Sequence, residues 1–281
     1  MSGEPSETER RLAVAQLEID PGDVQSNRER ALSAIDRAAA RDADIVALPE
    51  LFTIGYFSFE CYQRSAEALD GETFSTIAEA AAANGVAVVA GSIVEDLAAT
   101  TSAPVPAEEG LANTVAVFDS RGNRVAIYRK HHLFGYGSPE RELLVPGDRT
   151  PVVEVAGVRL GISTCYDLRF PELYRELLTK DVELVVVPSA WPYPRVEHWE
   201  TLARARAIEN LSYVATANGA GSFEEATLLG RSTVYDPWGV SLASSGDEAT
   251  LVEATVDPAR VRAIREEFPA VDDRRPDRWR E

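Results

Sequence analysis

Short apolar runs that alternate with longer amphipathic segments constrain the fold of this chain more than any other feature of its sequence. Continuous apolar runs such as Ile45–Leu48 are typical of strands buried on both faces, whereas the apolar spacing within Val24–Arg41 predicts a helix. The expected strands are 12–17, 45–48, 86–94, one that leads into a hairpin turn at 119–123, 125–128, 152–155, 158–162, 183–187, 213–217, 232–235 and 251–256. The expected helices are 24–41, 73–84, 197–210 and 258–267, with another beginning near Pro171. This alternation, with some hairpins, indicates an α/β fold of mixed sheets covered by helices.

Domain organisation is expected to be simple. The chain has no tandem repeat and no linker long enough to separate domains, and its 281 residues lie within the range of large single α/β domains. We therefore expect one domain over residues 1–281, with a core at about 11–257 and a C-terminal helix and tail at 258–281. Residues 97–110 lack periodicity and predict an exposed loop.

The charge of the chain excludes several classes of partner. Asp and Glu number 46 against 28 Lys and Arg, a net charge of −18, which disfavours nucleic acid and anionic membranes. Only two lysines occur, Lys130 and Lys180, and a lysine-poor, acid-rich chain is similar to the proteins of extreme halophiles. Solubility in a salty cytoplasm is the expected reason for the acidity, because the acids are spread along the whole chain; a docking face for a basic partner is the alternative.

The cysteines and the N-terminus bear on location and cofactors. Cys61 and Cys165 are too few for a disulfide framework and lack metal-site spacing, so we expect free thiols and neither metal nor cofactor. Residues 1–11 are polar and charged, unlike a signal peptide, and no apolar run approaches the ~20 residues of a membrane helix. A soluble, cytoplasmic protein is expected.

Three segments place reactive side chains just beyond the ends of expected buried strands, where ligands bind in α/β proteins. Glu50 follows the strand at 45–48, Lys130 ends the strand at 125–128, and Cys165 follows the strand at 158–162. Each has a plain structural alternative: a charge at a helix start, a solvated lysine and an inert core thiol. Retention of lysine in a chain that otherwise uses arginine suggests that a compact point charge is needed.

A nucleophilic cysteine needs a base and a cationic or dipolar setting. His131 and His132 lie beside Lys130, and His198 lies in the start of an expected helix, where a structural role is favoured. A Cys–His pair is therefore possible but not favoured. A carboxylate such as Glu50 would serve as the base if burial raised its pKa.

In these segments the chain resembles the nitrilase superfamily of carbon–nitrogen hydrolases, from about Leu12 to Asp277. The resemblance rests on LPELFTIGY (48–56), YRKHHLF (128–134), GISTCYDLRFPEL (161–173), ERELLVPG (140–147), WETLARARAIEN (199–210) and DPWG (236–239). It implies a four-layer αββα sandwich that pairs into a homodimer or a higher homo-oligomer. PSAWPYPRVEHW (188–199) and FPAVDDRRPD (268–277) are most similar to the small amidase branch near ω-amidase, which removes ammonia from short ω-amides of dicarboxylic acids.

The resemblance also implies a catalytic Glu–Lys–Cys triad of Glu50, Lys130 and Cys165. Glu140 matches the second glutamate of the family, with Glu142 as the alternative. In the mechanism that we expect, Glu50 takes the proton of Cys165, and a thioester forms and is hydrolysed.

Substrate contacts complete the expected site. The oxyanion is expected to be held by Lys130 and the backbone N–H of Tyr166. Arg169 is a candidate for binding a substrate carboxylate, or else for a structural ion pair with Asp167 or Glu172. Trp191 and Tyr56 are candidates for the pocket wall, with core packing as the alternative.

Other functions remain open at this stage. An N-carbamoyl amino acid amidohydrolase or a nitrilase would use the same site, and the sequence does not fix the acyl group. A metal-dependent amidohydrolase is disfavoured because the chain has three histidines and no HExxH motif. An inactive scaffold protein is disfavoured because every member of the triad is present.

Overall fold

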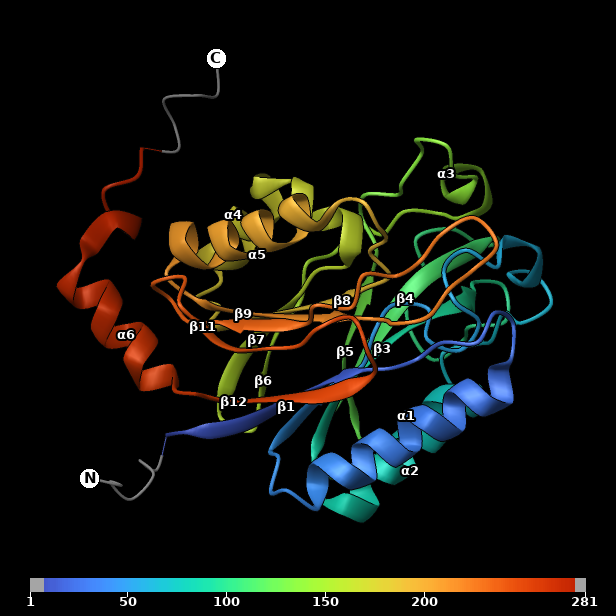
Figure 1. Cartoon of the computed structure of the whole chain (residues 1–281), viewed down its shortest axis with the longest axis horizontal. Helices are drawn as coiled ribbons and strands as arrows, with labels where there is room; N and C mark the ends of the chain where they lie inside the picture. The colour runs from blue at the N-terminus through green and yellow to red at the C-terminus, as the bar shows by residue number, and fades with distance from the viewer. Residues whose placement is uncertain (1–7, 276–281) are drawn as a thin grey trace.

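Two six-stranded sheets packed face to face form the centre of the structure, a computed structural model that describes residues 8–275 (Figure 1). The first sheet has the order β12–β1–β2–β3–β4–β5, with β1 (Arg10–Gln16), β2 (Ile45–Ala47), β3 (Ala87–Asp96), β4 (Leu111–Phe118), β5 (Arg124–Arg129) and β12 (Thr250–Val256). The second has the order β11–β10–β9–β8–β7–β6, with β6 (Val152–Val155), β7 (Val158–Ile162), β8 (Leu184–Ser189), β9 (Tyr213–Asn218), β10 (Thr233–Tyr235) and β11 (Ser241–Ser244).

Both sheets are mixed in the same way. Strands β1, β2 and β3 run parallel in the first sheet, and β7, β8 and β9 run parallel in the second. Antiparallel strands flank each parallel set: β12, β4 and β5 in the first sheet, and β6, β10 and β11 in the second. The carboxyl ends of the parallel strands lie at one edge of each sheet. The two edges meet, because the backbone N–H of Glu50, after β2, donates to the carbonyl of Ser189, at the end of β8, at 3.4 Å.

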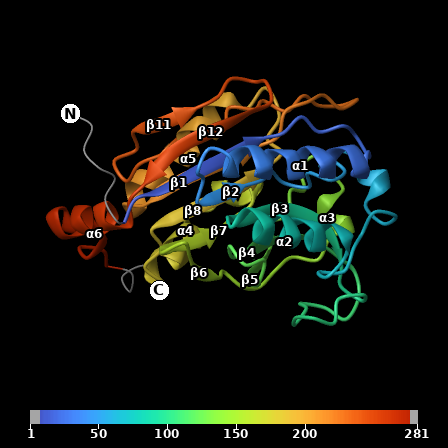
Figure 2. The ribbon, with the colours of Figure 1, turned by 90° about the horizontal axis from the view of Figure 1, so that it is seen from below.

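Helices cover the outer faces, which confirms the expected four-layer αββα sandwich (Figures 1 and 2). α1 (Val24–Ala39) and α2 (Glu72–Asn84) lie on the first sheet, and α4 (Pro171–Thr179) and α5 (Val196–Asn210) lie on the second. α6 (Pro258–Glu267) lies at one end of the sandwich, and the one-turn α3 (Glu140–Leu143) lies near the other. The 3₁₀ turns are 59–61, 165–169 and 269–271.

Local chemistry sets the helix ends. Asp23 begins α1 by accepting a hydrogen bond from the backbone N–H of Ser26. Gly85 ends α2 in the left-handed region, with φ of 66°. Asp257 begins α6 in the same way as Asp23, by accepting from the backbone N–H of Ala259.

Alternation along the strands explains why their apolar runs are continuous. In β2, Ile45 and Ala47 belong to the core between the sheets, whereas Val46 belongs to the core beneath α1 and α2. Side chains of successive strand residues point to opposite faces, so a strand between two apolar layers is apolar at every position.

The structure departs from the expected elements in a few places. β8 continues through Pro188 to Ser189, beyond the expected end at residue 187, because Pro188 still pairs with Ala217 of β9. The edge strand β11 and the short α3 were not expected. The tail expected at 258–281 is described only to residue 275, so Pro276 and Asp277 of the FPAVDDRRPD segment lie outside the described residues, as do residues 1–7. In the described part of the chain, no helix is long and apolar enough to cross a membrane.

Candidate active site

Glu50 lies in the turn that follows β2, and β3 holds that turn in place. The backbone N–H of Leu51 donates to Ser92 Oγ at 2.8 Å, and the N–H of Ser92 donates to the carbonyl of Pro49 at 3.3 Å. Gly91, with φ of 62°, allows this close approach, because a Cβ there would lie 2.1 Å from the Pro49 oxygen. The Glu50 side chain is consequently fixed and fully buried.

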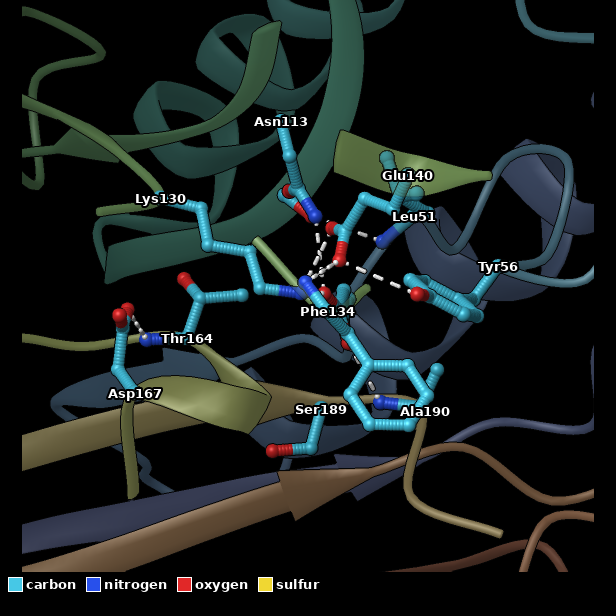
Figure 3. A network of polar contacts seen from close by, with 12 residues as sticks. Leu51, Tyr56, Asn113, Lys130, Phe134, Glu140, Thr164, Asp167, Ser189 and Ala190 are labelled. Carbon is cyan, nitrogen blue, oxygen red and sulfur yellow. Dashed lines mark hydrogen bonds and ion pairs between the residues drawn. The ribbon is translucent and has the colours of Figure 1, made fainter. Parts of the chain in front are cut away.

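Lys130 follows β5 and points between two buried carboxylates. Its Nζ lies 2.9 Å from Glu50 Oε1 and 2.7 Å from Glu140 Oε1, and Figure 3 shows it directed toward Glu140. The ammonium also lies 5.2 Å from the centre of the Tyr56 ring. Burial opposes the charged form, but Glu140 and Glu50 together raise the pKa of Lys130 well above its usual value. The lysine is therefore a permanent buried cation.

Glu140, on α3, is fixed by donors on its other oxygen. Tyr56 Oη lies 3.1 Å and the Phe134 backbone nitrogen 2.6 Å from Glu140 Oε2 (Figure 3). Burial raises the pKa of Glu140, while Lys130 opposes this shift. Glu142 is exposed to solvent, so Glu140 is the one of the two candidates that contacts Lys130.

Cys165 comes from the opposite sheet, in the turn after β7. Its φ of 47° lies in the left-handed region that a residue with a side chain rarely adopts. Burial and the charge of Glu50 raise the pKa of the Cys165 thiol well above its usual value, and Lys130 only partly opposes this. The thiol therefore carries its proton at neutral pH.

The turn after Cys165 supplies further donors. Tyr166 lies at the start of the 3₁₀ turn 165–169, where backbone N–H groups have no partner within the turn. The backbone N–H of Ala190, just after β8, donates to Glu50 Oε2 at 2.9 Å. Both sheets thus contribute to the polar cluster around Glu50.

Asp167, which we considered from the sequence only as an ion-pair partner of Arg169, ties the cysteine and lysine segments together. Its buried carboxylate accepts from Tyr128 Oη at 2.5 Å and from the backbone N–H of Thr164 at 2.9 Å. It also lies 2.7 Å from Nδ1 of His132. His132 is thus engaged by Asp167 rather than by Cys165.

A cavity of about 280 Å³ opens onto the cysteine. Its wall includes Tyr56, Lys130, Cys165, Tyr166, Arg169 and Trp191. The structure thus brings the residues expected at the site to a single cavity or to its immediate polar surroundings.

Arg169 is held by aromatic and imidazole contacts. Its guanidinium carbon lies 4.9 Å from the centre of the Trp191 ring, and Nη2 lies 3.2 Å from Nδ1 of His198. Burial lowers the pKa of Arg169. Within residues 8–275 no ion pair joins Arg169 to a carboxylate, so the pairs considered with Asp167 or Glu172 do not form.

Trp191 and Tyr56 combine the two roles considered for them. Both are nearly fully buried, yet both line the cavity. Trp191 Nε1 donates to the carbonyl of Arg195 at 3.1 Å, which fixes the ring against the cavity.

Neither cysteine forms a disulfide. Cys61 is buried away from the cavity, where Arg64 contacts its sulfur at 2.9 Å and burial raises the pKa of its thiol. Among the residues that the structure describes, no group of three or more His, Cys, Asp or Glu side chains could hold a metal ion.

The amino-acid sequence matches the family model for carbon–nitrogen hydrolases over residues 11–266. A relative named 2-oxoglutaramate amidase from Paenarthrobacter nicotinovorans is 36% identical over 279 residues, covering 98% of this chain and 92% of the relative. The omega-amidase NIT2 of Homo sapiens is 36% identical over 276 residues, covering 95% of each chain. Among solved structures, a mutant amidase from Nesterenkonia sp. AN1, showing covalent addition of the acetamide moiety of fluoroacetamide at its active site cysteine, has a TM-score of 0.83, 29% identity and 99% coverage of both chains.

Proposed function

The chain belongs to the carbon–nitrogen hydrolase family, and from this premise we propose that it is an amidase that releases ammonia from a small ω-amide through a thioester on Cys165. The observation that carries the proposal is the grouping of three charged or reactive side chains. Lys130 Nζ lies 2.9 Å from Glu50 Oε1, the charge of Glu50 raises the pKa of the Cys165 thiol, and Lys130 and Cys165 both line the cavity.

Acylation begins with proton transfer from Cys165 to Glu50 as the sulfur attacks the amide carbon. The carbonyl π electrons move to oxygen, and the resulting oxyanion accepts hydrogen bonds from Lys130 and the Tyr166 backbone N–H. Donors of this kind commonly contribute about 3–4 kcal/mol each to the transition state. When the tetrahedral intermediate collapses, the carbon–nitrogen bond breaks, and the leaving nitrogen takes the proton from Glu50 to depart as ammonia.

Deacylation repeats the same steps with water. Glu50 removes a proton from water as the oxygen attacks the thioester carbonyl, and the sulfur then leaves and recovers that proton. Amide and water give carboxylic acid and ammonia. Glu140 keeps Lys130 in position and supplies the second negative charge that holds the lysine protonated.

An ω-amide of a dicarboxylic acid is the substrate class that the cavity favours. Arg169 is a partly buried cation in the cavity wall without a carboxylate partner in the described chain, and a substrate carboxylate would supply one. The names of the relatives, 2-oxoglutaramate amidase and omega-amidase, support the same class. An N-carbamoyl amino acid or a nitrile acid would also carry a carboxylate, so these remain the alternatives within the family.

Substrate selection gives a first prediction. Changing Arg169 to leucine should raise KM for an ω-amide acid by about 10- to 100-fold, because a charge-assisted hydrogen bond to the substrate is lost. KM for a neutral amide of the same length should change little, and steady-state ammonia release measures both. Arg41→Leu, which removes an exposed ion pair with Glu253, is the control. Equal losses for both substrates would remove Arg169 from carboxylate binding.

The proposed function itself is tested by ammonia release from a panel of ω-amides, N-carbamoyl acids and nitriles. We expect turnover of ω-amides, and turnover of carbamoyl acids or nitriles alone would replace the proposal by one of its alternatives. The panel is run at low and at multimolar salt, because the net charge of −18 supports a halophilic, cytoplasmic enzyme. Labelling of Cys165 without turnover of any compound would indicate an inactive scaffold.

We also propose that two copies of the chain form a homodimer through an apolar patch defined by Ile208, Trp238, Val240 and Phe268. These side chains are 45%, 42%, 54% and 49% exposed. The Trp238 and Phe268 rings lie 5.6 Å apart, and Gly239 lies against Ile208, so the patch is continuous. A grouped apolar surface on so acidic a chain is typical of a surface that another protein covers.

The dimer gives a second prediction. Trp238→Glu should convert a particle of twice the 30.6 kDa chain into a monomer, because it places a charge in the apolar contact. Size-exclusion chromatography with light scattering measures the mass. Val125→Glu is the control, since Val125 is a 37% exposed apolar residue on β5 outside the patch. An unchanged mass for Trp238→Glu would exclude the patch as the interface.

A further inference from the structure

Asn113 contacts the Glu50 carboxylate and the backbone of Lys130, the two residues of the first sheet that the proposed mechanism uses. It lies on β4 and is 1% exposed. Its Nδ2 donates to Glu50 Oε1 at 2.8 Å, and its backbone carbonyl accepts from the backbone N–H of Lys130 at 2.9 Å. Figure 3 shows the Asn113 side chain directed into the same cluster as Lys130 and Glu140. One buried amide residue therefore links the base to the segment that carries the lysine.

The donors on Glu50 determine which of its oxygens is available to the cysteine. Each carboxylate oxygen accepts two hydrogen bonds. Asn113 Nδ2 and Lys130 Nζ occupy both positions on Oε1, and the Ala190 N–H occupies one on Oε2. The second position on Oε2 is therefore the one left for the Cys165 thiol. Removal of the Asn113 amide would open a position on Oε1, so that either oxygen could accept from the thiol.

A second observation concerns the other end of the Asn113 amide. Its Oδ1 is buried and has no hydrogen-bond partner in the described chain. Rotating the amide would turn this oxygen against the Glu50 carboxylate, so the hydrogen bond to Glu50 fixes its orientation. A buried, unpaired carbonyl costs stability, and chains retain such costs chiefly at functional sites. Fold stability alone therefore does not account for an asparagine here.

We propose that Asn113 is a positioning residue that holds the Glu50 carboxylate through Oε1 and leaves its Oε2 atom to Cys165. This inference rests on the proposed function, in which Glu50 is the base. The titratable groups whose charges act together with Glu50 are Tyr56, Tyr62, Lys130, Glu140 and Cys165. Unlike these, Asn113 donates to Glu50 without titrating, so its hydrogen bond persists at every pH.

The test compares Asn113→Leu and Asn113→Asp with the wild type across pH. Asn113→Leu keeps the size of the side chain but removes the donor, so kcat should fall about 10- to 100-fold while KM changes little. The acidic limb of the kcat/KM profile should move to higher pH by about one unit, because an ionised carboxylate that loses a donor is more easily protonated. Wild-type kcat with an unmoved acidic limb would overturn the proposal.

The Asn113→Asp variant distinguishes the effect of the hydrogen-bond donor from the effect of side-chain shape. The introduced carboxyl group, when protonated, can donate to Glu50 as the amide does, so this variant should be the more active of the two at acidic pH. Its activity relative to the wild type should then decline as the pH rises and the new carboxylate ionises. If the aspartate variant matched the leucine variant at every pH, the residue would act through its shape, and the proposal would be wrong.

Two controls complete the experiment. Asn210→Leu alters another asparagine that is 1% exposed, on α5, and should leave the pH profile unmoved even if it lowers the melting temperature. Alkylation of the Cys165 peptide by iodoacetamide, followed by mass spectrometry against pH, needs no substrate. If the wild type hydrolyses no amide, the proposed function fails, and the alkylation profile still decides on Asn113. A shift of the acidic limb of the alkylation profile in Asn113→Leu supports the inference, and an alkylation profile identical to that of the wild type overturns it.

Discussion

Replacement of Cys165 by alanine should lower kcat for amide hydrolysis by about 10⁴-fold or more, because loss of a nucleophile removes the covalent route entirely. The rest of the site should remain folded, since the wild-type thiol is neutral and alanine leaves the ion pairs of Lys130 intact. Ammonia release measures the loss, and the melting temperature checks the fold. The adduct expected on the wild-type protein after brief treatment with a slow amide substrate should also be absent by intact mass.

The second cysteine provides the matched control. Cys61→Ala should retain near-normal kcat, because Cys61 lies outside the cavity, in contact with Arg64. If Cys165→Ala kept near-normal turnover, or if Cys61→Ala lost it, the assignment of the nucleophile would be wrong.

Replacement of Lys130 should have the second large effect, on activity and stability together. Lys130→Arg should lower kcat by about 10³-fold, because a planar guanidinium is too broad for a fully buried site shaped around an ammonium. Lys130→Met should also lower the free energy of unfolding by about 3–5 kcal/mol, since Glu50 and Glu140 would be left as buried charges without a partner. Steady-state kinetics and urea unfolding measure the two effects.

The pH dependence of Lys130→Met provides a further check. Without the ammonium, burial and mutual repulsion raise the pKa of a carboxyl in the folded state, so its destabilising effect grows as the pH rises above the unfolded value of about 4.3. The stability deficit should therefore be larger at pH 8 than at pH 5. Lys180→Arg is the control, because that lysine pairs with Glu176 at the surface and should change stability by under about 1 kcal/mol. A deficit independent of pH would contradict the buried carboxylate pair.

The regular elements could be predicted because their signals are local. The predicted bounds 258–267 match those of α6, and the predicted strands 152–155 and 158–162 match β6 and β7, which pair as a hairpin. β11 escaped prediction because Ser241–Ser244 is a polar edge strand without an apolar run. Side-chain exposure in α5 could not be predicted from hydropathy, since the apolar Ile208 is exposed while the charged Arg206 is buried.

The candidate site was predictable only where its residues stand at strand ends. Glu50, Lys130 and Cys165 could be found in this way, and the motifs of the family reinforced them. Asn113 and Asp167 could not, because their importance comes from contacts between segments distant in sequence. Gly91 carried a weak signal, since a glycine inside a strand often marks a bulge or a close backbone approach. The turn of Glu50 supplies that approach.

The pairing of β12 with β1 determines when the first sheet can form during synthesis of the chain. The sheet that carries Glu50 and Lys130 is completed by residues 250–256, which pair with β1 along its whole length. A ribosome must therefore synthesise the chain as far as Val256 before this sheet can close. A product terminated before Thr250 would expose β1 as an unprotected edge, the kind of surface on which strands from other molecules assemble. Nonsense mutations upstream of the Thr250 codon should accordingly yield aggregates rather than shortened active enzyme.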